Sequence, residues 1–259
     1  MEEAKDCIRN WRSGILNLGH LGLTELPELP EGLTKLYCPN NHLTTLPDTL
    51  PAGLTMLCCY KNQLLSLPDT LPASLLELHC YHNRLSSLPD TLPASLTTLY
   101  CSKNQLLSLP DTLPAGIRVL QCSDNQLTTL PDTLPAGLQA LHCYENQLIR
   151  LPETLPADLQ LLNCMSNQLT TLPQTLPADL TIFTCSNNNF PDIEDDESIP
   201  DYVARVNAIA EAVNAIAEAA SKERIVQRCA LVFEELVQTV WHPLRVERLM
   251  LAGVDMEDM

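Results

Sequence analysis

The feature that most constrains this chain is a repeat with a period of 21 residues. Cysteine recurs at this spacing at Cys38, Cys59, Cys80, Cys101, Cys122, Cys143, Cys164 and Cys185. An asparagine follows each cysteine three positions later, at Asn41, Asn62, Asn83, Asn104, Asn125, Asn146, Asn167 and Asn188. Self-similarity at a fixed period of this length predicts a stack of equivalent structural units.

The residues within one unit indicate how the units stack. Leu99 and Cys101 alternate with Tyr100, which predicts a short strand with the leucine and the cysteine facing inward. One such strand cannot bury its inner face alone, so neighbouring units form a continuous parallel sheet over a shared core. The asparagine then turns the chain out of the strand, and its amide can bond the backbone of adjacent units. Two Leu-Pro pairs in the second half of each unit predict an extended convex side without helices.

This unit is identified as a leucine-rich repeat that carries cysteine at one of its apolar positions. We therefore expect an α/β solenoid, a curved leucine-rich-repeat horseshoe with short parallel strands on its concave face. About nine units run from Leu16 to Phe190, the first of them degenerate, with Leu18 at the cysteine position.

The two ends differ from the repeats in composition. Residues 1–14 are expected to form a capping helix, because Ala4, Cys7, Ile8 and Trp11 have helical spacing. Residues 15–190 form the solenoid, residues 191–200 an acidic linker, and residues 201–259 a helical cap or a small helical bundle.

Three helices are expected within the last segment. The first carries a heptad stripe that runs from Tyr202 to Ala220, the second begins at Ser221 as its N-cap, and the third lies within Trp241–Met259. A cap on the last repeat and a partner-binding or dimerising helix pair are both open interpretations of these helices.

The cysteines are expected to belong to the core, because free cysteine is among the most buried residue types. The alternative is a metal or redox site, but metal sites use paired ligands and each unit offers one thiol. No metal and no cofactor are therefore predicted, and a ladder of free thiols indicates a reducing, cytosolic compartment. Cys58 adjoins Cys59, so alternation points it to the concave face, where we expect an exposed thiol.

The concave positions of the repeats gather most of the aromatic side chains. Five of the six tyrosines of the chain fall there, together with several histidines and a lysine. Tyrosine combines apolar area with a polar tip, which suits interfaces. The predicted partner-binding residues are Tyr37, Tyr60, His79, Tyr81, His82, Tyr100, Lys103, His142 and Tyr144. The alternative is that aromatic residues merely tolerate strand positions.

The formal charge of −17 weighs against nucleic acid and anionic membranes as partners. The segment before Ser13 is acidic and lacks an apolar run, so it is not expected to be a secretory signal peptide. A further acidic row, from Asp48 to Glu153, lies on the convex edge and is interpreted as turn chemistry and solubility rather than as a binding stripe.

The repeat from Leu88 to Pro110 resembles the short leucine-rich repeats of secreted bacterial effectors, which bind host proteins on the solenoid. Some of those effectors carry a ubiquitin-ligase domain with a Cys-x-Asp motif, whereas the tail here has Cys229-Ala230-Leu231, so no ligase residues are carried over. The cysteine-bearing units and the ending Trp241–Met259 are also similar to repeat proteins of giant amoebal viruses.

The sequence predicts a non-enzymatic interaction protein that binds a protein partner on its concave Tyr/His-rich face. The resemblance adds a role as a host-directed effector in the host cytosol. Three alternatives remain: the substrate-recognition part of a ubiquitin-ligase pathway, a purely structural solenoid, and an enzyme that uses Cys58, His79 or His82 as its reactive group.

Overall fold

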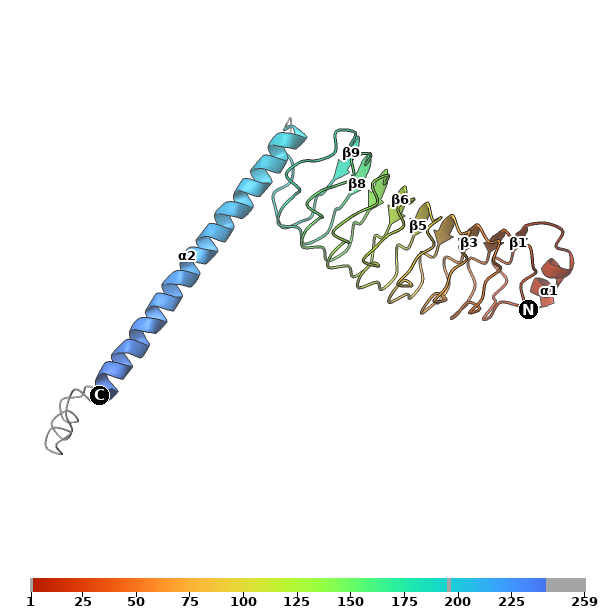
Figure 1. Cartoon of the computed structure of the whole chain (residues 1–259), viewed down its shortest axis with the longest axis horizontal. Helices are drawn as coiled ribbons and strands as arrows, with labels where there is room; N and C mark the ends of the chain where they lie inside the picture. The colour runs from red at the N-terminus through yellow and green to blue at the C-terminus, as the bar shows by residue number, and fades with distance from the viewer. Residues whose placement is uncertain (1, 195–196, 241–259) are drawn as a thin grey trace. The chain divides into compact units, whose positions relative to one another are not determined.

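Each repeat contributes a strand of only three residues, and these strands form one parallel sheet in the computed structural model. The structure describes residues 2–194 and 197–240. The described strands are β1 (Ile15–Asn17), β2 (Lys35–Tyr37), β3 (Met56–Cys58), β4 (Glu77–His79), β5 (Thr98–Tyr100), β6 (Val119–Gln121), β7 (Ala140–His142), β8 (Leu161–Asn163) and β9 (Ile182–Thr184). They pair in chain order, so each strand neighbours the next unit's strand (Figure 1). The predicted parallel solenoid is therefore confirmed.

The register of the sheet repeats without a slip. Leu36 pairs with Leu57, Leu57 with Leu78, and the same position pairs in every later unit. The middle residue of each strand from β1 to β8 is buried, while the first residue of each is at least partly exposed. A 21-residue unit thus places every equivalent side chain directly beside its counterpart one strand away.

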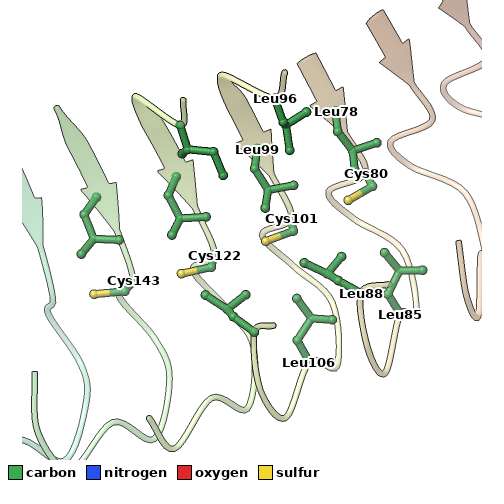
Figure 2. Close-up of a cluster of buried hydrophobic side chains, with 14 of the residues drawn as sticks. Leu78, Cys80, Leu85, Leu88, Leu96, Leu99, Cys101, Leu106, Cys122 and Cys143 are labelled. Atoms are coloured by element: carbon green, nitrogen blue, oxygen red, sulfur yellow. The ribbon is translucent and has the colours of Figure 1, made fainter. Parts of the chain in front are cut away.

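The core is a set of aligned leucine and cysteine columns. Cys80, Cys101, Cys122 and Cys143 have no exposed surface, and their sulfur atoms lie in one row beside the strand leucines (Figure 2). The convex side contains turns and bends between successive prolines, with no helix among the described residues of the repeats. Proline lacks the N–H that a helix interior needs, which explains this extended return path.

The asparagine side chains hold the backbone together where each strand ends. The Asn104 Nδ2 group donates to the carbonyl oxygens of Cys80 (3.1 Å) and Cys101 (3.0 Å), and its Oδ1 accepts from the Leu85 N–H (3.0 Å). Equivalent bonds recur from Asn41 to Asn188. Each amide therefore bonds backbone groups of two successive units, at a turn where other backbone groups bond directly from unit to unit, such as the His82 N–H to the Ser102 carbonyl (2.9 Å).

The helix α1 packs against the first repeat, and the first turns of α2 pack against the last. At the front, α1 (Glu2–Arg9) buries Ala4, and Cys7, Ile8 and Trp11 are partly buried against the core. At the other end, α2 (Ile199–Val240) begins with Tyr202, Val203 and Val206, which are all buried. The α2 helix is 42 residues long and continues through Ser221, so the predicted break and second N-cap there are wrong. The third helix predicted within Trp241–Met259 lies outside the described residues.

The first turns of α2 bond backbone groups of the repeats through an asparagine amide, as the units do among themselves. Asn207 Oδ1 accepts from the Leu172 N–H (3.0 Å), and Asn207 Nδ2 donates to the Leu172 carbonyl (3.0 Å). The Tyr202 hydroxyl donates to the Pro191 carbonyl (3.1 Å) and lies 3.4 Å from the Cys185 sulfur. After Asn207 the heptad stripe is exposed, since Ile209, Val213 and Ile216 are 39%, 58% and 70% accessible.

We expect Asn104→Ala to lower the free energy of unfolding by about 2–4 kcal/mol, because buried backbone groups of two units lose their partner at once. Urea denaturation followed by circular dichroism measures the change. The control is Gln105→Ala at the exposed neighbouring position, for which we expect a change within about 0.5 kcal/mol. Equal losses for the two variants would contradict the structural role of the amide.

Candidate binding face on the strands

The concave face is the side of the solenoid that carries the strands. Two rows of outward side chains flank the buried strand leucines, one before and one after them. The row after the leucine reads Tyr37, Cys58, His79, Tyr100, Gln121, His142, Asn163 and Thr184. A third row follows the core cysteines and includes Tyr60, Tyr81 and Tyr144. Because the register is unbroken, equivalent members of a row are nearest neighbours.

The aromatic rings of these rows stack on one another. The rings of Tyr60 and Tyr81 are parallel to within 6°, with centroids 4.5 Å apart. His79 and Tyr100 lie 4.6 Å apart at an angle of 33°. These separations match the spacing of neighbouring strands, about 4.8 Å, so the stacks follow directly from the register of the sheet. The result is a preorganised aromatic surface over β3 to β5.

The other predicted residues lie around this cluster rather than within one site. Tyr37 is on β2, where its hydroxyl donates to the Met56 sulfur (3.1 Å). His142 and Tyr144 belong to the β7 unit, and Gln121 and Ser123 of the β6 unit separate them from the cluster. Two strand spacings, about 10 Å, therefore divide the predicted set into a larger and a smaller group.

His82 and Lys103 lie at the edge where the chain leaves the strands. This position has a left-handed backbone in every unit, with φ between 52° and 63° from His20 to Asn187. No glycine occupies it, although such φ values favour glycine. The shared backbone conformation gives the side chains a common direction along this edge. Lys103 Nζ lies 4.0 Å from the Asp124 carboxylate of the next unit.

Cys58 is the predicted concave residue whose environment differs most from expectation. The prediction of an exposed thiol is wrong, because only 2% of Cys58 is accessible. Its neighbours in the row, Tyr37 on one side and His79 on the other, pair with it directly in the sheet. The larger side chains of both strands cover the small thiol, so pointing outward does not make it accessible.

Cys58, His79 and Glu77 form a chain of polar contacts. The Cys58 sulfur lies 3.6 Å from His79 Nδ1, and His79 Nε2 lies 3.4 Å from a Glu77 carboxylate oxygen. Burial raises the pKa of Cys58 to about 11, and the Glu77 carboxylate adds to this increase. Burial also lowers the pKa of His79, against the opposing effect of Glu77. At neutral pH the thiol is therefore protonated, which is not the state of a nucleophilic cysteine.

Sequence reasoning missed the row that precedes the strand leucines, namely Lys35, Met56, Glu77, Thr98, Val119, Ala140, Leu161 and Ile182. The signal was present, because a strand with an inward leucine has an outward residue on either side of it. This row is polar or charged at Lys35 and Glu77 and apolar from Val119 to Ile182, where Ile182 is 51% exposed. It extends the concave face by one full row.

The described residues contain neither a cluster of metal-ligating side chains nor a membrane-spanning helix. Among residues 2–194 and 197–240, no three His, Cys, Asp or Glu side chains are grouped so that they could hold a metal ion. The same part of the chain holds no helix that is long and apolar enough to span a membrane.

We expect the thiols of the repeats to resist alkylation in the folded chain. Burial raises the pKa of Cys38, Cys80 and Cys122 to about 12, which leaves almost no thiolate at pH 7.5. In a Cys7→Ser/Cys229→Ser variant, iodoacetamide should label none of the nine remaining cysteines until urea is added. Mass spectrometry counts the labels. Rapid labelling of Cys58 in the folded protein would contradict this account and revive a reactive-thiol function.

We expect stability to decrease below about pH 6.5 in part through His79. Its folded pKa is lowered by burial, so the unfolded chain binds the proton first as the pH falls, and each further decrease favours unfolding. This contribution is absent above the unfolded pKa of about 6.5. Urea unfolding at pH 7.5 and pH 5.5 should show a smaller loss for His79→Gln than for the unchanged chain. An equal loss in both proteins would show that His79 does not titrate on unfolding.

Comparison with known proteins relates the repeats to those of bacterial proteins. No family model matches the chain. A stretch of 49 residues is 49% identical to the E3 ubiquitin-protein ligase SspH1 of Salmonella typhimurium. This stretch covers 18% of the present chain and 7% of that protein. The chain therefore spans only a small part of this curated relative.

Two solved structures extend the likeness over most of the solenoid. The leucine-rich-repeat domain of a Shigella effector is 34% identical, with a TM-score of 0.52, over 66% of this chain and 74% of the domain. The functional domain of InlJ from Listeria monocytogenes, described as including a cysteine ladder, is 26% identical with a TM-score of 0.58, over 69% and 45%. The chain therefore belongs to the leucine-rich-repeat family, with repeats of the kind found in bacterial effectors.

Proposed function

We propose that the solenoid binds a protein partner through the aromatic cluster on its concave face. The observation that carries the proposal is the pair of ring stacks, Tyr60 on Tyr81 and His79 on Tyr100, on adjoining strands. Exposed aromatic area gathered on one face is typical of an interface. The stacks also hold these rings in place before any partner arrives, which reduces the entropy lost on binding.

The family adds support for a binding role over a catalytic one. The matched structures are repeat domains, and repeat solenoids present extended surfaces of this kind to other proteins. The described cysteines are all free thiols, which fits a role in a reducing cytosol. By analogy with the effector domains, the partner is a host protein, and the chain acts in the cytosol of that host.

Affinity capture from a eukaryotic cytosolic lysate tests this proposal. The triple variant Tyr60→Ala/Tyr81→Ala/Tyr100→Ala should retain at least tenfold less partner than the unchanged chain, since aromatic anchors each contribute about 2 kcal/mol or more. The matched control is Leu65→Ala/Leu107→Ala/Ile149→Ala, which removes exposed apolar side chains from another side of the repeats. Circular dichroism and the urea midpoint verify that both variants are folded. Equal capture by the tyrosine variant, or capture of nothing, would contradict a concave binding face.

The match to SspH1 favours a second, narrower candidate, in which the solenoid supplies substrate recognition in a ubiquitin-ligase pathway. Mass spectrometry of the same captures distinguishes it from simple partner binding. Ubiquitin-conjugating or ubiquitin-ligase proteins in the wild-type capture would support this candidate. A captured partner without any of them would contradict it.

A further inference from the structure

The charged side chains of the first repeats are separated between the two sides of the solenoid. Between residues 35 and 111 the chain has four lysines and arginines: Lys35 on β2, Lys61 and Lys103 just after β3 and β5, and Arg84 beyond the asparagine turn that follows β4. Four of the five acidic residues of the same segment lie in the convex turns, at Asp48, Asp69, Asp90 and Asp111. A strongly acidic protein therefore carries a basic patch on one face.

This basic patch, defined as Lys35, Lys61, Arg84 and Lys103, adjoins the aromatic cluster. Lys61 directly follows the cluster residue Tyr60, Lys103 comes three residues after the cluster residue Tyr100, and both lie on the exit edge of the strands. Among the described residues, Lys35, Lys61 and Arg84 make no salt bridge within 4 Å, and Lys103 has only the 4.0 Å contact with Asp124. These cations are thus available to pair with charges on a partner.

The positive charge of the patch ends at a defined unit, and few carboxylates lie near its cations. Of the nearby carboxylates, Glu77 lies 3.4 Å from His79, and Asp124 lies 4.0 Å from Lys103 at the end of the patch. On the exit edge the sign of the charge changes after Lys103, where Asp124 and Glu145 occupy the next two equivalent positions. An anionic ligand is therefore attracted to the units of β2 to β5 and repelled from those of β6 and β7.

We propose that this patch binds an extended acidic segment of the protein partner, with the segment's apolar side chains on the tyrosine cluster. The inference rests on the proposed function and names the chemistry of the partner at the same face. A polypeptide with a few carboxylates suits four cations, whereas a polyanion is repelled at longer range by the chain's net charge of −17. The facing sides of Tyr60 and Tyr81 are already in contact with each other, so no base can enter between them.

The repeat spacing also defines the spacing of the acidic side chains. Lys61 and Lys103 occupy the same position two units apart, which places their backbones about 10 Å from each other in a parallel sheet. A segment in the extended polyproline II conformation has three residues per turn and advances about 3.1 Å per residue, so its residues i and i+3 point to the same side about 9 Å apart. The segment therefore carries carboxylates at positions i and i+3.

Fluorescence anisotropy of the full chain tests the proposal. The probe is a fluorescein-labelled 12-residue peptide of Ser, Thr and Val with Glu at every third position, and its control is the same peptide with Gln in place of Glu. We expect the Glu peptide to bind at least tenfold more tightly than the Gln peptide at low ionic strength, and to lose affinity as salt is added.

Charge reversal on the protein locates the binding. We expect Lys61→Glu and Lys103→Glu each to weaken the Glu peptide about fivefold or more, as for charged groups at an interface. The matched control is Arg150→Glu, an equal charge change at an exposed residue near Asp132 and away from the concave face, for which we expect less than a twofold change. All three variants change exposed side chains, so their folding should be unaffected.

The remaining outcomes separate this inference from the proposed function. No binding of the Glu peptide, or equal binding of both peptides, would overturn the acidic specificity. A lysate partner that is lost with the tyrosine variant but kept with Lys61→Glu would also overturn the acidic specificity. The proposed binding face would then still stand. Tighter binding of a fluorescein-labelled 12-nucleotide oligothymidine than of the peptide, abolished by Lys61→Glu, would assign the patch to nucleic acid and overturn the inference.

Discussion

The hydrogen bonds of the asparagine amides are the interaction on which the rest of the structure depends. A strand of three residues offers few ladder bonds, so it needs partners for the backbone groups at the turn that follows. Asn104 supplies them with Nδ2 bonds to Cys80 and Cys101 and an Oδ1 bond from Leu85. The register of the strands, the columns of the core and the ring stacks on the concave face all follow from this exact repetition of the turn.

Most of the fold could be predicted from the sequence because its information is periodic. The 21-residue spacing of Cys and Asn determines the number of strands, their pairing and the inward residues. Two predictions were wrong, and each error has a physical reason. Cys58 has the predicted orientation, but it is buried by Tyr37 and His79 of the neighbouring strands. The alternation within a single unit cannot predict this burial. Helix α2 passes through Ser221, because a serine can cap a helix but does not end one.

The candidate site was predictable in its residue types and less so in its organisation. The concave tyrosines were evident from the rows, but the ring stacks at 4.5 Å and 4.6 Å and the gap before His142 depend on which units are neighbours. The overall charge of −17 does not show how the charges are distributed over the surface. Between residues 35 and 111 the two signs are separated, because four aspartates lie in the turns after proline whereas the lysines lie on the strands or just after them.

The unbroken amide ladder also constrains how such a protein can change in length. An added or deleted segment preserves every bond across the units only when it contains a whole number of 21-residue repeats. Any other length shifts the asparagine away from the carbonyl groups that it bonds in the preceding unit. Gene duplication within the repeats can therefore lengthen the solenoid without new packing, and each duplicated unit inserts its own outward residues into the face. The concave face therefore changes one unit at a time, while the core remains unchanged.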